Sequence, residues 1–222
     1  MSQVRINDIE VTVNDSRSYS NNLRYVFLKR AIDVFGALFG LVILSPILIA
    51  VGIAIRFDSK GPILYSQVRV GKDGKCFKMY KFRSMVTNAE ELLDKIKDKN
   101  EMDGPMFKIK KDPRITNVGK FIRRTSIDEL PQLMNILNGD MSLVGPRPSL
   151  PNEVAEFEPW MIERLSVKPG LTCFWQVSGR NNIGFKEWME MDIKYVRERN
   201  TLTDIKLILK TAMLMLGDKN AH

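Results

Sequence analysis

The stretch VFGALFGLVILSPILIAVGIAI, residues 34–55, decides how the rest of this chain is placed, because none of its 22 residues is charged. At about 1.5 Å per residue, a helix of this length matches the hydrocarbon core of a bilayer, about 30 Å thick. A secretory signal peptide explains it less well, because the run is long, starts late and has no small-residue cleavage pattern after it. The run therefore predicts a membrane helix.

A proline interrupts this run near its middle, at Ser45-Pro46. Proline lacks a backbone N–H, clashes with the preceding helical turn and pushes the residue before it away from helical angles. The run becomes limbs of 11 and 9 residues. The longer limb covers only about 17 Å, roughly half of the hydrocarbon core, so each limb can enter the bilayer and turn back. A proline-kinked helix that crosses the bilayer is the alternative.

Basic residues lie on both sides of the apolar run. Three of them stand within the ten positions before it, and residues 56–83 hold eight basic and two acidic side chains, a net +6. Because basic flanks favour the cytoplasmic side, we predict that residues 23–57 form a re-entrant helix-break-helix and that residues 58–222 form a cytoplasmic domain. The residues that define this topology are Lys29, Arg30, Ser45 and Pro46.

The composition excludes several classes of protein. The 222 residues, 44% hydrophobic and 27% charged, suffice for a domain with a core and exclude a disordered or collagen-like chain. The net charge of +8 favours an anionic partner such as phosphate, nucleic acid or an acidic lipid surface. The single histidine, His222, leaves no candidate for a hydrolase triad or a zinc site. Cys76 and Cys173 fit no metal or disulfide spacing and indicate buried thiols in a reducing compartment.

The pattern along the chain predicts an α+β fold that is predominantly helical. Residues 1–22 are polar and rich in Asn and Ser, so we predict a flexible polar leader without helix or strand. The runs 63–70 and 76–83 flank Asp73-Gly74 and predict a small β-hairpin. A short strand is expected over residues 171–177. Helical spacing predicts helices over residues 88–99, 127–137, 152–165, 185–199 and 203–216.

Two adjacent carboxylates, Asp128 and Glu129, are the candidates for chemistry. A structural explanation is available, because Ser126 and Glu129 fit a capping box and acids in a first helical turn complement the helix dipole. If the site is functional, an aspartate held at a helix N-terminus could bind magnesium or attack phosphorus. Neighbouring helical residues point about 100° apart, so the two carboxylates are expected to have different roles.

The surrounding cations favour an anion site. Arg123 lies just upstream of the carboxylates, and Arg147 and Arg180 stand in the turn-rich stretches Gly-Pro-Arg-Pro and Gly-Arg-Asn-Asn. Guanidinium groups beside a helix N-terminus bind phosphate oxygens. Lys81 belongs to a run that alternates cations with aromatics, which fits a solvated edge strand and a phosphate-contacting strand equally well. No P-loop, dinucleotide fingerprint or DNA-binding motif accompanies them.

Eight motifs are spread through residues 24–210: KRAID at 29–33, SP at 45–46, YKFRSM at 80–85, DPRIT at 112–116, SIDELPQ at 126–132, GDMSLVGPRP at 139–148, KPGLT at 168–172 and QVSGRN at 176–181. Together they resemble the bacterial sugar transferases. These are monotopic polyprenol-phosphate phosphoglycosyl transferases that start exopolysaccharide, capsule, O-antigen and glycoprotein glycan assembly. Any one motif alone would be weak.

The resemblance implies a re-entrant membrane helix broken at Ser45-Pro46 and a two-step reaction. Asp128 would attack the sugar-linked phosphorus of a nucleotide diphosphate sugar, with uridine as the family's expected nucleoside, and release the nucleoside monophosphate. Polyprenol phosphate, undecaprenyl phosphate in the family, would then take the sugar phosphate. Mg²⁺ would offset the diphosphate charge, held by Asp128 and Glu129. Phosphate contacts would come from Arg123 and Arg180 and, with weaker support, from Lys81 and Arg147.

The implied location is the cytoplasmic membrane, with the catalytic domain, residues 58–222, on its cytoplasmic face. The expected partners are the nucleotide-sugar donor, the polyprenol phosphate acceptor and membrane lipid, with no nucleic acid, while a homo-oligomer is left open. Larger relatives carry an additional block of membrane helices, so we expect a compact single-domain form. An insertion lies between Met85 and Asp112 relative to the smallest members.

Two alternatives stay open at this point. A membrane-tethered basic module that binds anionic lipid or nucleic acid would also explain the +6 stretch, and for such a module Asp128 would be dispensable. A glycosyltransferase that moves the sugar alone would release the nucleoside diphosphate. The sequence does not name the sugar.

Overall fold

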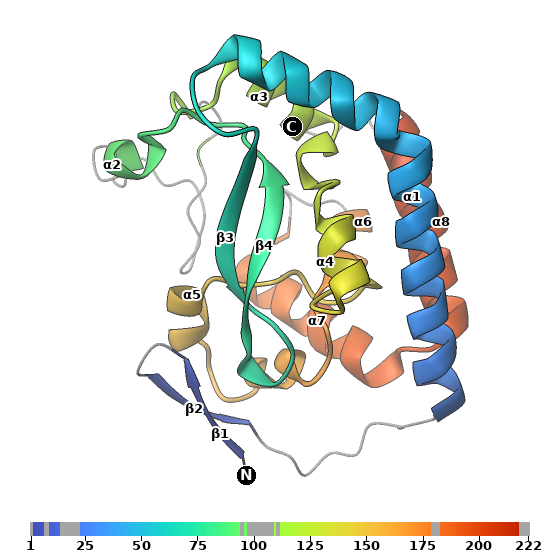
Figure 1. The fold of residues 1–222 in the computed structure, drawn as a ribbon. Coiled ribbons are helices and arrows are strands. Elements are labelled where there is room, and N and C mark those ends of the chain that lie inside the picture. Colours follow the sequence, from blue (N-terminus) through green and yellow to red (C-terminus); the bar gives the residue numbers. More distant parts are fainter. Residues whose placement is uncertain are drawn as a thin grey trace.

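The computed structural model describes residues 2–6, 9–13, 23–93, 96, 109, 112–178 and 183–217. One long helix wraps around two sides of a domain built from a β-hairpin, short helices and a parallel strand pair (Figure 1). The fold class is confirmed as α+β and predominantly helical.

The elements are β1 (Ser2–Ile6), β2 (Ile9–Val13), α1 (Leu23–Asp58), β3 (Leu64–Val70), η1 (Lys72–Gly74), β4 (Cys76–Phe82), α2 (Ala89–Leu93), α3 (Asn117–Arg124), η3 (Ile127–Glu129), α4 (Gln132–Asn138), β5 (Ser142–Val144), α5 (Pro151–Ala155), η4 (Met161–Ser166), β6 (Gly170–Thr172), α6 (Phe174–Val177), α7 (Phe185–Glu198) and α8 (Thr201–Gly217).

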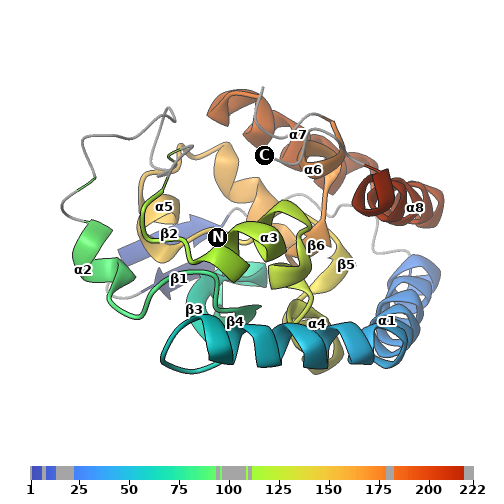
Figure 2. The same cartoon turned by 90° about the horizontal axis from the view of Figure 1, so that it is seen from above.

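Helix α1 bends in its middle but does not stop at the proline. The helix continues through Pro46, and its two halves run in different directions over the domain (Figures 1 and 2). Pro46 has no N–H to offer the carbonyl of Val42, and the Ser45 hydroxyl donates a hydrogen bond to that carbonyl at 2.8 Å instead. The predicted change of direction is therefore present as a bend, and the predicted break between two separate limbs is corrected.

The two halves of α1 pack on different parts of the same domain. Ala37 in the first half joins a cluster with Leu133 and Ile136 of α4. Val51 and Ile55 in the second half join a cluster with Phe82 of β4 and Ile122 of α3. Both ends of the helix therefore lie against one domain.

The outer side of α1 stays apolar and uncovered. Phe35, Phe39 and Ile49 are 72%, 68% and 64% exposed. Within the described residues, α1 is the helix that is long and apolar enough to cross a membrane. So large an exposed apolar face indicates that the protein associates with a membrane.

The basic residues before the apolar run face the domain. The Lys29 ammonium donates to Asp204 Oδ2 at 3.0 Å, and the Arg30 guanidinium donates to the carbonyls of Ile136 and Leu137 at 2.7 and 2.9 Å. Arg30 thereby satisfies carbonyls at the C-terminal end of α4. Each cation thus finds protein acceptors that a sequence pattern does not reveal, and the role of Lys29 and Arg30 as membrane-flanking charges stays a prediction.

The central hairpin agrees with the sequence. Strands β3 and β4 pair antiparallel from Leu64 opposite Phe82 to Val70 opposite Cys76, around the turn η1. The side chain of Asn135 in α4 bonds to the outer edge of β4, since it accepts from the Tyr80 N–H at 3.0 Å and donates to the Lys78 carbonyl at 2.8 Å. This contact fixes the position of β4 relative to α4.

Several predicted elements differ from the observed ones. Residues 2–6 and 9–13 form an antiparallel hairpin, so the expectation of no strand in the leader is wrong there, and the alternation of apolar residues in 4–6 and 9–13 is the signal that was missed. The strand predicted over 171–177 ends at Thr172 and gives way to α6. The helix predicted over 152–165 is two short elements, α5 and η4. Cys173 is buried as predicted, whereas Cys76 is exposed.

We predict that Asp33→Ala detaches the first half of α1 and lowers the melting temperature. Asp33 is buried and accepts hydrogen bonds from the Ser142 hydroxyl and the Leu143 N–H, both at 2.9 Å. Loss of these charge-assisted bonds costs about 3 kcal/mol, or about 6–12 °C in a chain of this size. Thermal melts in detergent measure the effect. The exposed Asp73→Asn is the control and should stay within about 2 °C, and an equally small shift for Asp33→Ala would contradict the prediction.

Candidate active site

The two candidate carboxylates lie on η3, a single 3-10 turn between α3 and α4. The helix predicted over 127–137 is divided here, because α4 begins only after Pro131. Ser126 adopts a left-handed conformation, with φ 56° and ψ 16°, and its side chain makes no capping hydrogen bond. A helix cap needs an extended residue, so the capping-box explanation of Ser126 and Glu129 is wrong. A serine at positive φ beside two carboxylates is the kind of backbone strain that gathers at functional sites.

Glu129 is held by two cations. The Lys81 ammonium of β4 donates to Glu129 Oε1 at 2.7 Å, and the Arg147 guanidinium donates to the same oxygen at 3.3 Å. The side chain of Glu129 is only 15% exposed. The two cations, opposing the effect of burial, hold the pKa of Glu129 well below its usual range. Glu129 is therefore an ionised anchor for Lys81 and Arg147.

Asp128 has a different environment. It is 8% exposed, and its carboxylate accepts no hydrogen bond from any residue that the structure describes. Burial, followed by the negative charge of Glu129, raises the pKa of Asp128 to about 6, although Lys81, Arg123 and Arg147 act in the opposite direction. The expectation that the two neighbours have different roles agrees with this geometry, since one carboxylate is paired and the other is open.

The remaining predicted cations divide into three cases. Lys81 and Arg147 come together on Glu129, from strand β4 and from the loop after β5. Arg123 is exposed at the C-terminal end of α3 and is near enough to lower the pKa of Asp128. Arg180 lies outside the described residues.

Arg69 of β3 is a further cation of the site that the sequence motifs do not predict. Its guanidinium donates to the Pro148 carbonyl at 3.2 Å and to Gln67 Oε1 at 2.7 Å, and its side chain is 14% exposed. Burial, followed by the charge of Arg147, lowers the pKa of Arg69 to about 10. The sequence pattern that could have indicated Arg69 is a cation within an alternating strand, just before the turn at Gly71. With Lys81 and Arg147, it makes this side of Glu129 positive and suited to anions.

The described residues fit a magnesium ion only if a bound substrate phosphate supplies further ligands. Within the described residues no three His, Cys, Asp or Glu side chains gather to form a cage. Lys81 and Arg147 both bind Oε1 of Glu129, which leaves Oε2 together with the carboxylate of Asp128. Magnesium in proteins is commonly held by one or two carboxylates, with waters and substrate phosphates completing its shell. Asp128 and Glu129 therefore fit an ion that arrives with a phosphorylated substrate.

The chain belongs to the bacterial sugar transferase family, whose profile matches residues 24–218. It is 48% identical over 193 residues to a protein named galactosyl transferase CpsE of Streptococcus agalactiae serotype III, covering 86% of this chain and 43% of that one. It is 43% identical over 203 residues to the undecaprenyl-phosphate galactose phosphotransferase of Salmonella typhimurium, covering 88% and 42%. It is 36% identical over 187 residues to the exopolysaccharide production protein ExoY of Rhizobium meliloti, covering 82% and 83%. The chain thus spans less than half the length of the first two relatives and most of the third.

We predict opposite stability effects for the two neighbouring carboxylates. Because the pKa of Asp128 in the folded protein, about 6, is above its ordinary value of 3.8, the penalty for its ionisation is absent below about pH 3.8 and complete above about pH 6. Asp128→Asn should therefore stabilise the protein at pH 7.5 by up to about 3 kcal/mol, and this gain should disappear as the pH falls toward 4.

Glu129→Gln is the matched comparison. The pKa of Glu129 is lowered, so its charge stabilises the fold above its ordinary pKa of 4.5, and the neutral variant should melt at a lower temperature at pH 7.5. Melting curves of both variants between pH 4 and 8 test the pair. If the melting temperatures of both variants shifted in the same direction at pH 7.5, the assignment of Asp128 as the open and Glu129 as the cation-bound carboxylate would be contradicted.

Proposed function

We propose that the protein is a polyprenol-phosphate phosphoglycosyl transferase. It transfers a sugar-1-phosphate from a UDP-sugar to undecaprenyl phosphate, and this is the first membrane step of exopolysaccharide, capsule, O-antigen or glycoconjugate assembly. One observation carries the proposal: Asp128 is a buried carboxylate that accepts no hydrogen bond from the described residues, and it lies beside a cation-bound Glu129, next to the apolar helix of a bacterial sugar transferase. The name of the Salmonella relative supports undecaprenyl phosphate as the acceptor and a sugar phosphate as the transferred group.

In the first step Asp128 is the nucleophile. A carboxylate oxygen of Asp128 forms a bond to the sugar-linked phosphorus of the donor, and the bond from this phosphorus to the oxygen that bridges the two phosphates breaks. UMP leaves with that oxygen, and the sugar phosphate is bound to Asp128 as an acyl phosphate. The carboxylate is reactive because it accepts no hydrogen bond from the described residues and is shielded from water.

In the second step the acceptor regenerates the carboxylate. An oxygen of polyprenol phosphate bonds to the same phosphorus, the bond to Asp128 breaks, and polyprenyl-diphospho-sugar leaves. The lipid can reach this point because Ile127, the residue before Asp128, packs against the cluster that contains Val51 and Ile55 of α1. The nucleophile therefore lies beside the helix that is expected to enter the bilayer.

The cations stabilise charge on the phosphates. Arg147 and Lys81 are held at Glu129, and Arg123 is exposed nearby, so their N–H groups are available to the non-bridging phosphate oxygens. Arg180, which lies outside the described residues, stays a further phosphate contact implied by the family resemblance. Magnesium, held by Asp128 and Glu129 when bound, would supply further neutralisation of the diphosphate.

The packing of α1 supports a re-entrant topology, in which both ends of the helix lie on one side of the membrane. We infer that this side is the cytoplasmic face, because basic residues are frequent on both sides of the apolar run. The first half of the helix is tied to the domain through Lys29 and Asp33. At the other end Asp58 accepts from the Val118 N–H at 3.0 Å, and Arg83 donates to the Ser59 carbonyl at 2.8 Å. Attachment of both ends to one domain favours their placement on the same side of a bilayer.

The nucleotide that the protein releases tests the chemistry. Purified protein with Mg²⁺, polyprenol phosphate and a panel of UDP-sugars should release UMP with at least one donor, and Asp128→Asn should reduce that rate at least 1,000-fold, on the order of the loss when a nucleophile is removed. Melting curves serve as the folding control. Release of UDP would replace the proposal with transfer of the sugar alone, and no release with any donor would favour the basic membrane-binding module.

Labelling of single cysteines tests the topology. In a Cys76→Ser background, Leu23→Cys and Lys60→Cys place thiols at exposed positions at the two ends of α1. In intact bacterial spheroplasts neither thiol should react with a membrane-impermeant maleimide, and both should react in inverted vesicles. Reaction of one position in intact spheroplasts would show a spanning helix and overturn the re-entrant topology.

A further inference from the structure

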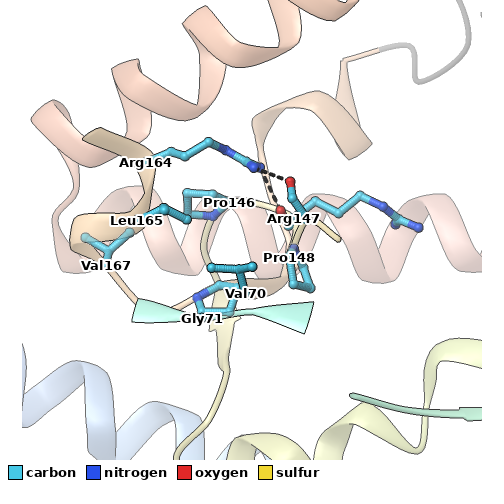
Figure 3. Close-up of a pocket in the computed structure, with 10 residues that line it drawn as sticks. Val70, Gly71, Pro146, Arg147, Pro148, Arg164, Leu165 and Val167 are labelled. Carbon is cyan, nitrogen blue, oxygen red and sulfur yellow. Dashed lines mark hydrogen bonds between the residues drawn. The ribbon is translucent and has the colours of Figure 1, made fainter. Parts of the chain in front are cut away.

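A second arginine forms hydrogen bonds to the loop that carries Arg147. Arg164 of η4 donates to the Arg147 carbonyl at 2.6 Å and also to the Ser149 hydroxyl. Figure 3 shows these two bonds at a pocket under the loop, with the side chain of Arg147 extending away from Arg164. On the other side of the loop, the Val70 N–H donates to the Ser149 carbonyl at 2.9 Å. The backbone of Arg147 therefore has little freedom to move.

Arg164 is itself fixed by a buried carboxylate. It is 2% exposed, and its Nε and one terminal nitrogen bond to Asp192 Oδ2 of α7 at 3.0 and 2.6 Å. The rings of Phe157 and Trp188 lie 5.4 and 5.6 Å from its guanidinium. A buried ion pair contributes little net stability compared with a well-packed apolar pair. Its value here lies in the geometry that it imposes on the loop.

The guanidinium of Arg147 is supported from the same helix. It lies over the ring of Trp175, 5.9 Å from the ring centroid, and Trp175 stacks on Trp188 at 4.9 Å with an interplanar angle of 26°. Trp188 and Asp192 are four residues apart in α7 and share one helix face. One face of α7 therefore supports both ends of Arg147, the carbonyl through Arg164 and the guanidinium through Trp175.

We propose that Asp192 and Trp188 of α7 are positioning residues that act through Arg164 and Trp175 to hold Arg147 against Glu129 and the donor phosphates. This role rests on the proposed phosphoglycosyl transfer, to which it adds two supporting residues that lie 60 and 64 positions after Asp128 in the chain. Small displacements of a positioned group cost large factors in rate. Loss of Asp192 should therefore act on turnover even though it touches no substrate.

The test is a double-mutant cycle on UMP release. Asp192→Asn should lower kcat about tenfold in the wild-type background, and less than twofold in the Arg147→Ala background, because the group it positions is already gone. Trp188→Phe keeps an aromatic face in the core and provides a milder second variant with the same expected pattern. Equal losses in both backgrounds would mean a general structural effect and would overturn the proposal.

The matched control is the exposed ion pair between the same two elements. Arg197 of α7 donates to Glu163 of η4 at 2.7 Å, with the Arg197 side chain 49% exposed. Arg197→Gln should change kcat less than twofold in either background, since exposed pairs contribute little. A tenfold loss for this variant would show that any loosening between η4 and α7 is sufficient, and it too would overturn the proposal.

A readout that does not depend on activity separates this proposal from the proposed function. The side-chain ¹⁵N resonances of Arg147, assigned by comparison with Arg147→Ala, should show a restrained guanidinium in the wild type and a mobile one in Asp192→Asn. Arg197→Gln should leave them unchanged. If no donor releases UMP but Asp192→Asn mobilises Arg147, the proposed function fails and the positioning role stands. An Arg147 signal that is unaffected by Asp192→Asn overturns the positioning role whatever the activity.

Discussion

Attachment of both halves of α1 to one domain is the constraint on which the rest of the structure depends. The first half packs on α4 and the second on α3 and β4, so the bend at Pro46 has to match the outline of the domain. Helix α4 links this constraint to the site. Arg30 of α1 caps one end of α4, and the turn that carries Asp128 precedes the other end. The position of α1 and the position of Asp128 are thus set by the same short helix.

The site separates two adjacent carboxylates by environment. Both are largely buried, and burial alone would raise the pKa of each. Lys81 and Arg147 reverse the effect for Glu129 alone, because their hydrogen bonds go to Glu129 and none goes to Asp128. Glu129 stabilises the charges of Lys81 and Arg147. Asp128 in its ionised form is destabilised, because it is buried beside the negative charge of Glu129. A reactive group of this kind lowers the stability of the fold, as is common where function needs an unsatisfied side chain.

The cations in turn depend on layers behind them. Lys81 is placed by strand β4, which Asn135 of α4 holds through two backbone hydrogen bonds. Arg147 is placed by a loop whose carbonyl and guanidinium both find support from α7. Support from two helices, α4 and α7, thus converges on Glu129. The positions of Lys81 and Arg147 therefore depend on side chains that do not themselves contact Glu129.

Much of the architecture could be predicted from local sequence, because the patterns that indicate helices and strands involve residues close together in the chain. The uncharged run with its proline, the alternation around Asp73-Gly74 and the helical spacing in 185–199 and 203–216 each report on neighbours within a few residues. The motif around Asp128 and Glu129 marked the site for the same reason. The hairpin of residues 2–13 was missed although its alternation is equally local.

Only the tertiary structure decided how these parts are used. Lys29 and Arg30 look like membrane-flanking charges in sequence, yet they bind acceptors more than 100 positions away in α8 and α4. The partners of Glu129 lie 48 and 18 positions away, and those of Arg164 and Asp192 lie 28 positions apart. Local periodicity reports which face of an element is apolar, but it does not report which distant charge will be buried beside which. The sequence by itself therefore determined most of the elements and singled out Asp128 and Glu129 as the candidate carboxylates, and the packing of α1, α4 and α7 decided the ionisation and the support of the site.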